Sequence, residues 1–254
     1  MNTFTILRRE LSSYFRSPVA YAVLFFFALI TGFFFYAGVR SFLQQSLQMT
    51  MMGQSVPLNV NEWVVQNVLG NMNVINLFVI PIITMRLFAE EKRSGTFELL
   101  STSPLRDAEI ILGKWLAAMV LYVAGVSITL LNMAVLFAYG NPDWRPMAVG
   151  YLGVILQGGC LLAIGTFLST LTKNQIIAAM SAFGVCILLF VMDWVASFDS
   201  SPLFKVISYI SVSAHSSQFV RGVIDSKDAA YYVSMIFLGL FLSGRSLESI
   251  RWRA

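Results

Sequence analysis

Long apolar stretches alternate with short polar ones along this chain, and the pattern predicts helices that cross a membrane. One helical crossing takes about 20 predominantly apolar residues, and six stretches come close to that length. We expect the crossings at 19–39, 72–89, 115–139, 147–171, 176–198 and 229–244. The last stretch is short for a crossing, so we expect Arg245 to extend it by reaching toward the interface. The predicted fold class is an all-α integral membrane protein.

The first residues, 2–17, have a different pattern. Apolar side chains recur at steps of three and four, while Arg8, Ser12 and Arg16 fall on the other side. Such a pattern indicates an amphipathic helix that lies in the membrane surface, and Pro18 ends it before the first crossing. The alternative is a helix packed against a soluble partner.

Two connections are long and polar. Residues 40–71, rich in Gln, Asn and Met, predict a sizeable loop with a short surface helix near 62–69. Residues 199–228 are too polar to cross lipid alone, so we expect one or two short helices there, outside or re-entrant. Asparagines crowd the start of the second crossing, where they either hydrate a helix end, the interpretation we favour, or line a polar vestibule. They are Asn67, Asn71, Asn73 and Asn76.

Composition agrees with a membrane protein. The 254 residues are 57% hydrophobic and only 12% charged, whereas soluble domains are about 25% charged. The crossings use up the length, so the whole chain, 1–254, is expected to form a single transmembrane domain. The net charge of +4 is scattered beside apolar stretches, which excludes a nucleic-acid partner. Because most basic residues fall on the side of the N-terminus, both termini are predicted to be cytoplasmic.

Motifs for chemistry within the chain are missing. The sequence has no G-x-x-x-x-G-K-[ST] phosphate loop, so we expect no ATP site in this chain. The lone His215 has no nearby second ligand, which predicts a structural hydrogen bond in place of a metal site. Asp193, beside a tryptophan, is expected to be an interfacial carboxylate. No catalytic residue, cofactor site or metal site is predicted, and the chain is not expected to be an enzyme.

One cytoplasmic segment, 90–113, holds the densest charge. Gly95 can end the helix that descends from the second crossing, and Thr96–Ser101 can then form a short helix with Leu99 and Leu100 on one side. A new helix is expected to start at Pro104 and lead into the third crossing. Apolar knobs ringed by charge suit the docking of a cytoplasmic partner, while a solvated loop is the equal alternative.

The run from Glu90 to Pro104 resembles the signature E-E-(x)3-G-T-x-E-L-L-x-T-x-P of ABC-2-type permeases. In that family the stretch is a coupling helix that fits a cleft on the ATPase subunit. The resemblance implies that the matching residues couple this chain to an ATPase. They are Glu90, Glu91, Gly95, Thr96, Phe97, Glu98, Leu99, Leu100 and Pro104.

Within this family, residues 211–225 and the ending 245–252 resemble the branch of the gliding-motility permeases, and more distantly the branch for nitrous oxide reductase maturation. The resemblance implies a permease of the bacterial inner membrane that works in export or force transmission. Its expected partners are ABC ATPase subunits carrying ATP and Mg, a second identical or related permease chain, membrane lipid and an auxiliary extracytoplasmic protein. The alternative function is a membrane anchor that recruits a cytoplasmic partner and transports nothing.

Overall fold

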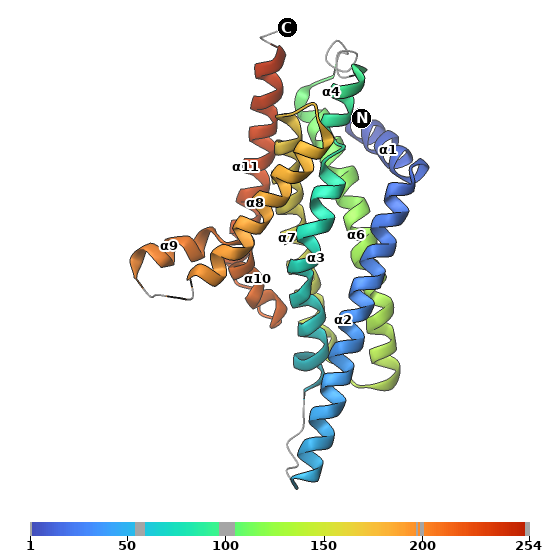
Figure 1. Cartoon of the computed structure of the whole chain (residues 1–254), viewed down its shortest axis with the longest axis vertical. Coiled ribbons are helices and arrows are strands. Elements are labelled where there is room, and N and C mark those ends of the chain that lie inside the picture. The colour runs from blue at the N-terminus through green and yellow to red at the C-terminus, as the bar shows by residue number, and fades with distance from the viewer. Residues whose placement is uncertain (1, 54–58, 97–104, 197, 199–200, 252–254) are drawn as a thin grey trace.

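Six long helices make up the body of the part of the chain that the structure describes (Figure 1). The computed structural model describes residues 2–53, 59–96, 105–196, 198 and 201–251, and no strand occurs among them. The long helices are α2 (Pro18–Met51), α3 (Gln66–Thr84), α6 (Asp107–Tyr139), α7 (Trp144–Thr170), α8 (Gln175–Ala196) and α11 (Ser226–Arg251). Each lies in a helical run long and apolar enough to cross a membrane, which confirms the predicted all-α membrane fold with six spans.

The short helix α1 (Asn2–Arg16) precedes the first long helix and packs against α6. Its apolar side buries Ile6 and Tyr14. Ser17 then adopts an extended backbone and caps α2, whose first residue is Pro18. Because proline has no N–H to donate and disfavours a helical residue before it, the chain turns sharply between the two helices. We call the junction of α1 and α2 the elbow.

The predicted loop at 40–71 is wrong over most of its length. Helix α2 continues to Met51, and its 34 residues end only before Gly53, which has a positive φ of 69°. A short π-helix, η1 (Asn61–Val65), then leads directly into α3. A polar stretch ends a membrane crossing, but it does not have to end the helix. Gln, Leu and Met are good helix formers, and no proline or glycine interrupts residues 40–51, so α2 continues.

The central helix is α7, which contacts α3, α6, α8, α10 and α11. The apolar window of α7 is 67% buried, compared with 22% for those of α2 and α8. Glycines on α7 allow this close packing, as small residues do between membrane helices. A Cβ on Gly153 would lie 2.3 Å from the Phe219 side chain, and one on Gly165 would lie 2.5 Å from the Thr84 hydroxyl.

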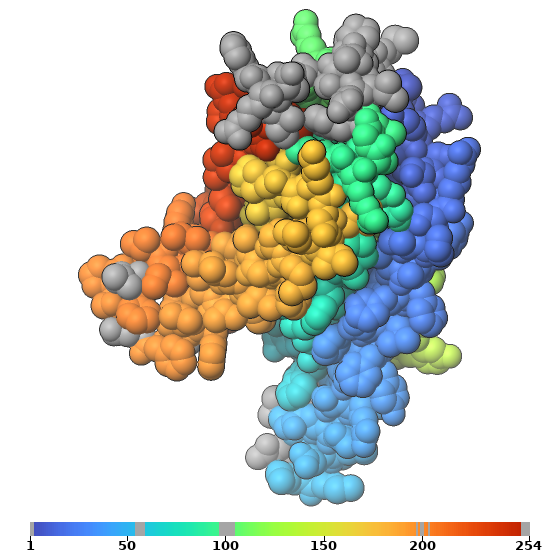
Figure 2. All heavy atoms as spheres, turned by 45° about the horizontal axis from the view of Figure 1, so that its top comes forward, coloured from blue at the N-terminus to red at the C-terminus, as the bar shows by residue number. Residues whose placement is uncertain are grey.

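The described part of the predicted connection, residues 201–228, contains the two short helices α9 (Pro202–Ile210) and α10 (Val212–Val220). Helix α10 packs into the bundle against α7, whereas α9 and the end of α8 project sideways (Figures 1 and 2). The last helix is longer than the predicted 229–244 and continues to Arg251. Beyond Gly244, Arg245 and Glu248 form an ion pair within the same helix. Helix α1, the end of α11 and the helix that follows α3 lie at one end of the bundle (Figure 1).

Gly158 provides a test of this packing, because a Cβ there would meet the buried Tyr122 ring at 2.1 Å. We expect Gly158→Ala to lower the free energy of unfolding by about 1 to 3 kcal/mol, the usual cost of overpacking. Thermal unfolding in detergent measures the change. The control is Gly184→Ala on α8, where no described atom lies within 4 Å of the new Cβ. Equal effects of the two substitutions would contradict close packing at α7.

Candidate functional site

The charged segment predicted to couple the chain to a partner begins on the short helix α4 (Ala89–Ser94), which follows α3 after a turn. Glu90 and Glu91 lie in its first turn. Gly95 ends it with a left-handed backbone, φ 75°, as the sequence predicted. Thr96 is the last described residue of this segment. The other predicted coupling residues, Phe97, Glu98, Leu99, Leu100 and Pro104, lie outside the described residues.

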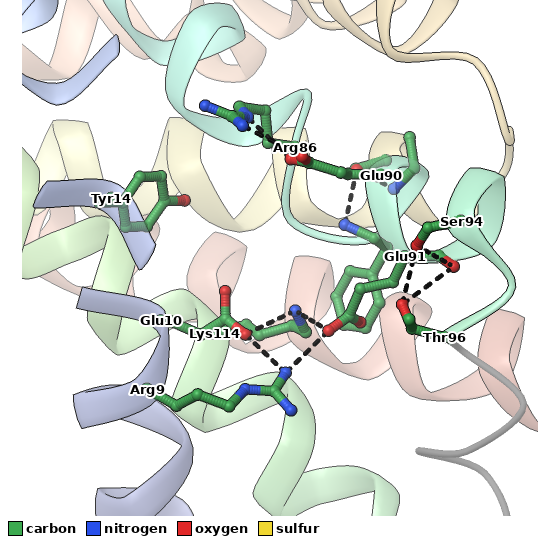
Figure 3. A network of polar contacts seen from close by, with 12 residues as sticks. Arg9, Glu10, Tyr14, Arg86, Glu90, Glu91, Ser94, Thr96 and Lys114 are labelled. Carbon is green, nitrogen blue, oxygen red and sulfur yellow. Dashed lines mark hydrogen bonds and ion pairs between the residues drawn. The ribbon is translucent and has the colours of Figure 1, made fainter. Parts of the chain in front are cut away.

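A buried lysine joins α4 to two other helices (Figure 3). Lys114 on α6 has a side chain that is 1% exposed, and its Nζ lies 3.1 Å from Glu10 on α1 and 3.0 Å from Glu91 on α4. Arg9 approaches the same two carboxylates from the outside, at 2.9 and 2.8 Å. We call these four residues the Lys114 cluster. The two positive charges of this cluster balance its two negative charges.

The cations of the Lys114 cluster favour the ionised form of Glu10. Burial alone would raise the pKa of Glu10, but Lys114 and Arg9 outweigh it and hold that pKa below its ordinary value. The ring of Phe88 lies 5.3 Å from the Lys114 Nζ and shields one side of the amine from water. Breaking a buried pair leaves an uncompensated charge, which typically costs about 3 to 5 kcal/mol. The cluster therefore holds α1, α4 and α6 together.

A second ion pair connects α4 to the elbow. Arg86 binds Glu90 through two nitrogens, at 2.7 and 3.0 Å, and donates a third hydrogen bond to the Ser17 hydroxyl at 2.9 Å. Nearby, the Tyr14 hydroxyl donates to the Ile83 carbonyl at 3.3 Å. These bonds attach both sides of the elbow to the end of α3.

Helix α7 holds α4 from the other side. The Ser169 hydroxyl accepts hydrogen bonds from the backbone N–H groups of Phe88 and Ala89, at 3.1 and 3.2 Å. Lys92 donates to the Thr170 carbonyl. Helix α4 is therefore bonded to α1, α6 and α7 at once.

Most of these contacts were not predicted from the sequence. Lys114 lies far along the sequence from Arg9 and Glu10, so no local pattern links them. The one hint in the sequence is that Lys114 and Glu10 are isolated charges. Lys114 begins an otherwise apolar stretch, and Glu10 is the one acidic residue of α1. A lone charge beside a membrane span usually faces the protein interior and has a partner there.

A second polar feature is a cleft of about 460 Å³ near the opposite end of the bundle, between η1, α3, α8 and α10. It is lined by Glu62, Asp193 and Arg221 together with amide and serine side chains. Asn67 and Asn73 lie on its wall, whereas neither amide atom of the buried Asn76 has a hydrogen-bond partner among the described residues. The alternative that we considered, a polar vestibule lined by asparagines, therefore fits Asn67 and Asn73. The interpretation that we favoured, simple hydration of a helix end, does not describe these two residues or the buried Asn76.

His215 has the structural role predicted for it. One ring nitrogen lies 2.6 Å from the Asp228 carboxylate and the other 3.0 Å from the Tyr209 carbonyl. The ring also stacks on Tyr231 with a centroid separation of 4.0 Å. Both nitrogens are occupied by protein groups, and the residue joins α10 to the start of α11.

Six membrane-crossing helices and a charged helix fixed at one end define a multi-pass membrane subunit. Residues 4–240 match the family described as ABC-2 family transporter protein, and the chain belongs to that family. Two curated relatives, from Escherichia coli K12 and O157:H7, are both named "Probable multidrug ABC transporter permease YbhR". Each is 29% identical over 104 residues, which cover 41% of this chain and 28% of the relative. The match therefore spans just over a quarter of these relatives.

Removal of the buried amine tests the Lys114 cluster. We expect Lys114→Ala to lower the free energy of unfolding by about 3 kcal/mol, because it leaves Glu10 and Glu91 facing each other without the buried cation. Lys227→Ala is the control, since that side chain is 81% exposed and 3.8 Å from Asp225. It should change stability by less than about 1 kcal/mol. Denaturant titration in mixed micelles compares the two, and equal losses would contradict the cluster's role.

The lowered pKa of Glu10 predicts a pH dependence. Its stabilising contribution is complete above the ordinary pKa of 4.5 and is lost as the pH falls through the lower pKa of the folded protein. The unfolding temperature of Glu10→Gln should therefore lie below that of the wild type at neutral pH. The difference should shrink as the pH falls below that range. A difference that stays constant with pH would show that the carboxylate charge is not what stabilises the site.

Proposed function

We propose that this chain is the permease subunit of an ATP-driven ABC-2-type exporter or force transmitter. The observation that carries the proposal is that the Lys114 cluster fixes α4, whose Glu90 and Glu91 begin the motif that resembles the family's coupling segment. A separate ATPase would dock on Thr96–Ser101 and supply ATP and Mg. Family membership from residue 4 to residue 240 supports the same function.

The contacts of α4 suggest how the motion would spread. A partner that pushes the segment after Gly95 would move α4 as a rigid piece, because α4 is bonded to α1, α6 and α7. A flexible loop would dissipate the same push. Two such chains would pack together and tilt their helices against each other as the ATPases close. The end of the bundle that holds α4 would face the cytoplasm of a bacterial inner membrane.

The finer assignment within the family rests on the sequence. The likeness of residues 211–225 and 245–252 to the gliding-motility branch favours force transmission to an extracytoplasmic partner. The curated relatives are named for multidrug transport, which favours export of small molecules. We propose force transmission, because the sequence likeness that favours it includes α10 and its bonded His215, a part of the chain with a defined structure.

Charge reversal in the coupling motif tests the proposal. We expect Glu98→Lys to abolish the stimulation of the partner ATPase by this chain while leaving insertion unchanged. The matched control, Glu248→Lys, reverses a half-exposed carboxylate near the end of α11. It should retain stimulation, because that surface pair contributes little. The measurement is ATP hydrolysis by the complex purified through a tag on this chain.

The same purification distinguishes the alternative. Recovery of a protein with a phosphate loop supports the transporter. If no such protein co-purifies in mild detergent, the chain is better described as an anchor for another cytoplasmic partner. Normal stimulation of hydrolysis by Glu98→Lys would instead refute docking through the coupling motif.

A further inference from the structure

A cleft of about 440 Å³ opens at the elbow, and the described residues that line it are all arginine or serine. Its walls are Arg9, Ser12, Ser13, Arg16, Ser17 and Arg86. Four of these residues, at positions 9, 12, 13 and 16, recur at helical steps and form one face of α1. The other two come from the cap of α2 and the turn after α3. Three separate segments therefore direct the same two side-chain types into one space.

The donors in the cleft are not used up by contacts within the protein. Arg16 is exposed and has no ion pair among the described residues. Arg9 bonds its carboxylates through one nitrogen, Nη2, so its other N–H groups are available. The hydroxyls of Ser12 and Ser13 are exposed.

The charge around the cleft is positive. The cations in its walls and in the Lys114 cluster directly behind it are Arg9, Arg16, Arg86 and Lys114, and the carboxylates are Glu10, Glu90 and Glu91. One positive charge remains after these groups are paired, and it belongs to Arg16. Guanidinium groups and hydroxyls in a concave site suit the oxygens of a phosphate.

The surroundings favour a phosphate that belongs to a lipid. The cleft lies where α2 begins its apolar run, the level expected for lipid headgroups. Beside it, Phe15 and Tyr21 form an exposed edge-to-face pair with centroids 6.1 Å apart. Aromatic residues of this kind gather at membrane interfaces. Tyr21 starts a stripe along α2 that continues through Phe25 and Leu29, which are 70% and 56% exposed. An acyl chain can lie along this stripe.

We propose that the elbow cleft binds the phosphate of an anionic phospholipid, with Arg16 as its main cation and the three serines as hydrogen-bond donors. The bound lipid holds the elbow at the level of the membrane surface. Arg9 and Arg86 pair with Glu91 and Glu90 of the coupling motif. Arg16 and the three serines make no such pair among the described residues, so Arg16 tests lipid binding separately from ATPase docking.

Lipid titration tests the site. Phosphatidylglycerol is added to the detergent-purified full-length chain, and native mass spectrometry measures the fraction of protein with bound lipid. We expect Arg16→Gln to raise the half-saturating lipid concentration about tenfold, the effect of losing one charge-assisted contact. The matched control is Arg8→Gln, the same substitution on the same helix at an exposed position outside the cleft. It should shift the concentration by less than about twofold, as a screened surface charge does.

Three results would overturn the proposal. Equal weakening by both substitutions would mean that the lipid responds only to the general charge of α1. No effect of Arg16→Gln would remove the cleft as the site. Displacement of phosphatidylglycerol from the wild type by millimolar inorganic phosphate would assign the cleft to a soluble anion.

Discussion

The amine of Lys114 is the constraint around which one end of this protein is built. It is 1% exposed on a helix that continues into an apolar span, and a charge in that place must be neutralised by neighbours. Glu10 and Glu91 do so from two other helices, so α1, α4 and α6 cannot separate without leaving a buried charge unpaired. The position of α4, with Glu90 and Glu91, depends on this one side chain.

Helix α7 links that end to the opposite one. Its Ser169 receives the first N–H groups of α4, while its Gly150 and Gly153 lie against Leu69 and Phe219, which lie next in sequence to residues that line the polar cleft. The glycines remove side chains that would act as spacers, so neighbouring helices contact the α7 backbone directly. A closely packed route through α7 therefore connects α4 to the polar cleft near the opposite end of the bundle.

Much of the fold could be predicted from the sequence, because apolar length alone identifies a membrane span and Gly95 alone can end α4. The loop at 40–71 was missed because residues of α2 that leave the apolar run still prefer a helix. The Lys114 cluster was missed for another reason. Lys114 and Glu10 are separated by 104 positions, and no local periodicity reports a contact over that distance. In the sequence, Lys114 is only a basic residue near a span. Such a residue is equally expected where basic residues set the orientation of the chain in the membrane.

The central claim is that α1 and α4 move as one body when the partner ATPase works. Spin labels at Arg8 and Arg93, both exposed, would report the separation of these helices, and the native Cys160 and Cys186 are buried. A third label at Lys205 on α9 would serve as a distant reference. Pulsed electron resonance on the complex, with and without ATP, should give an unchanged distance between Arg8 and Arg93 while both move relative to Lys205. A change between Arg8 and Arg93 on addition of ATP would contradict the account.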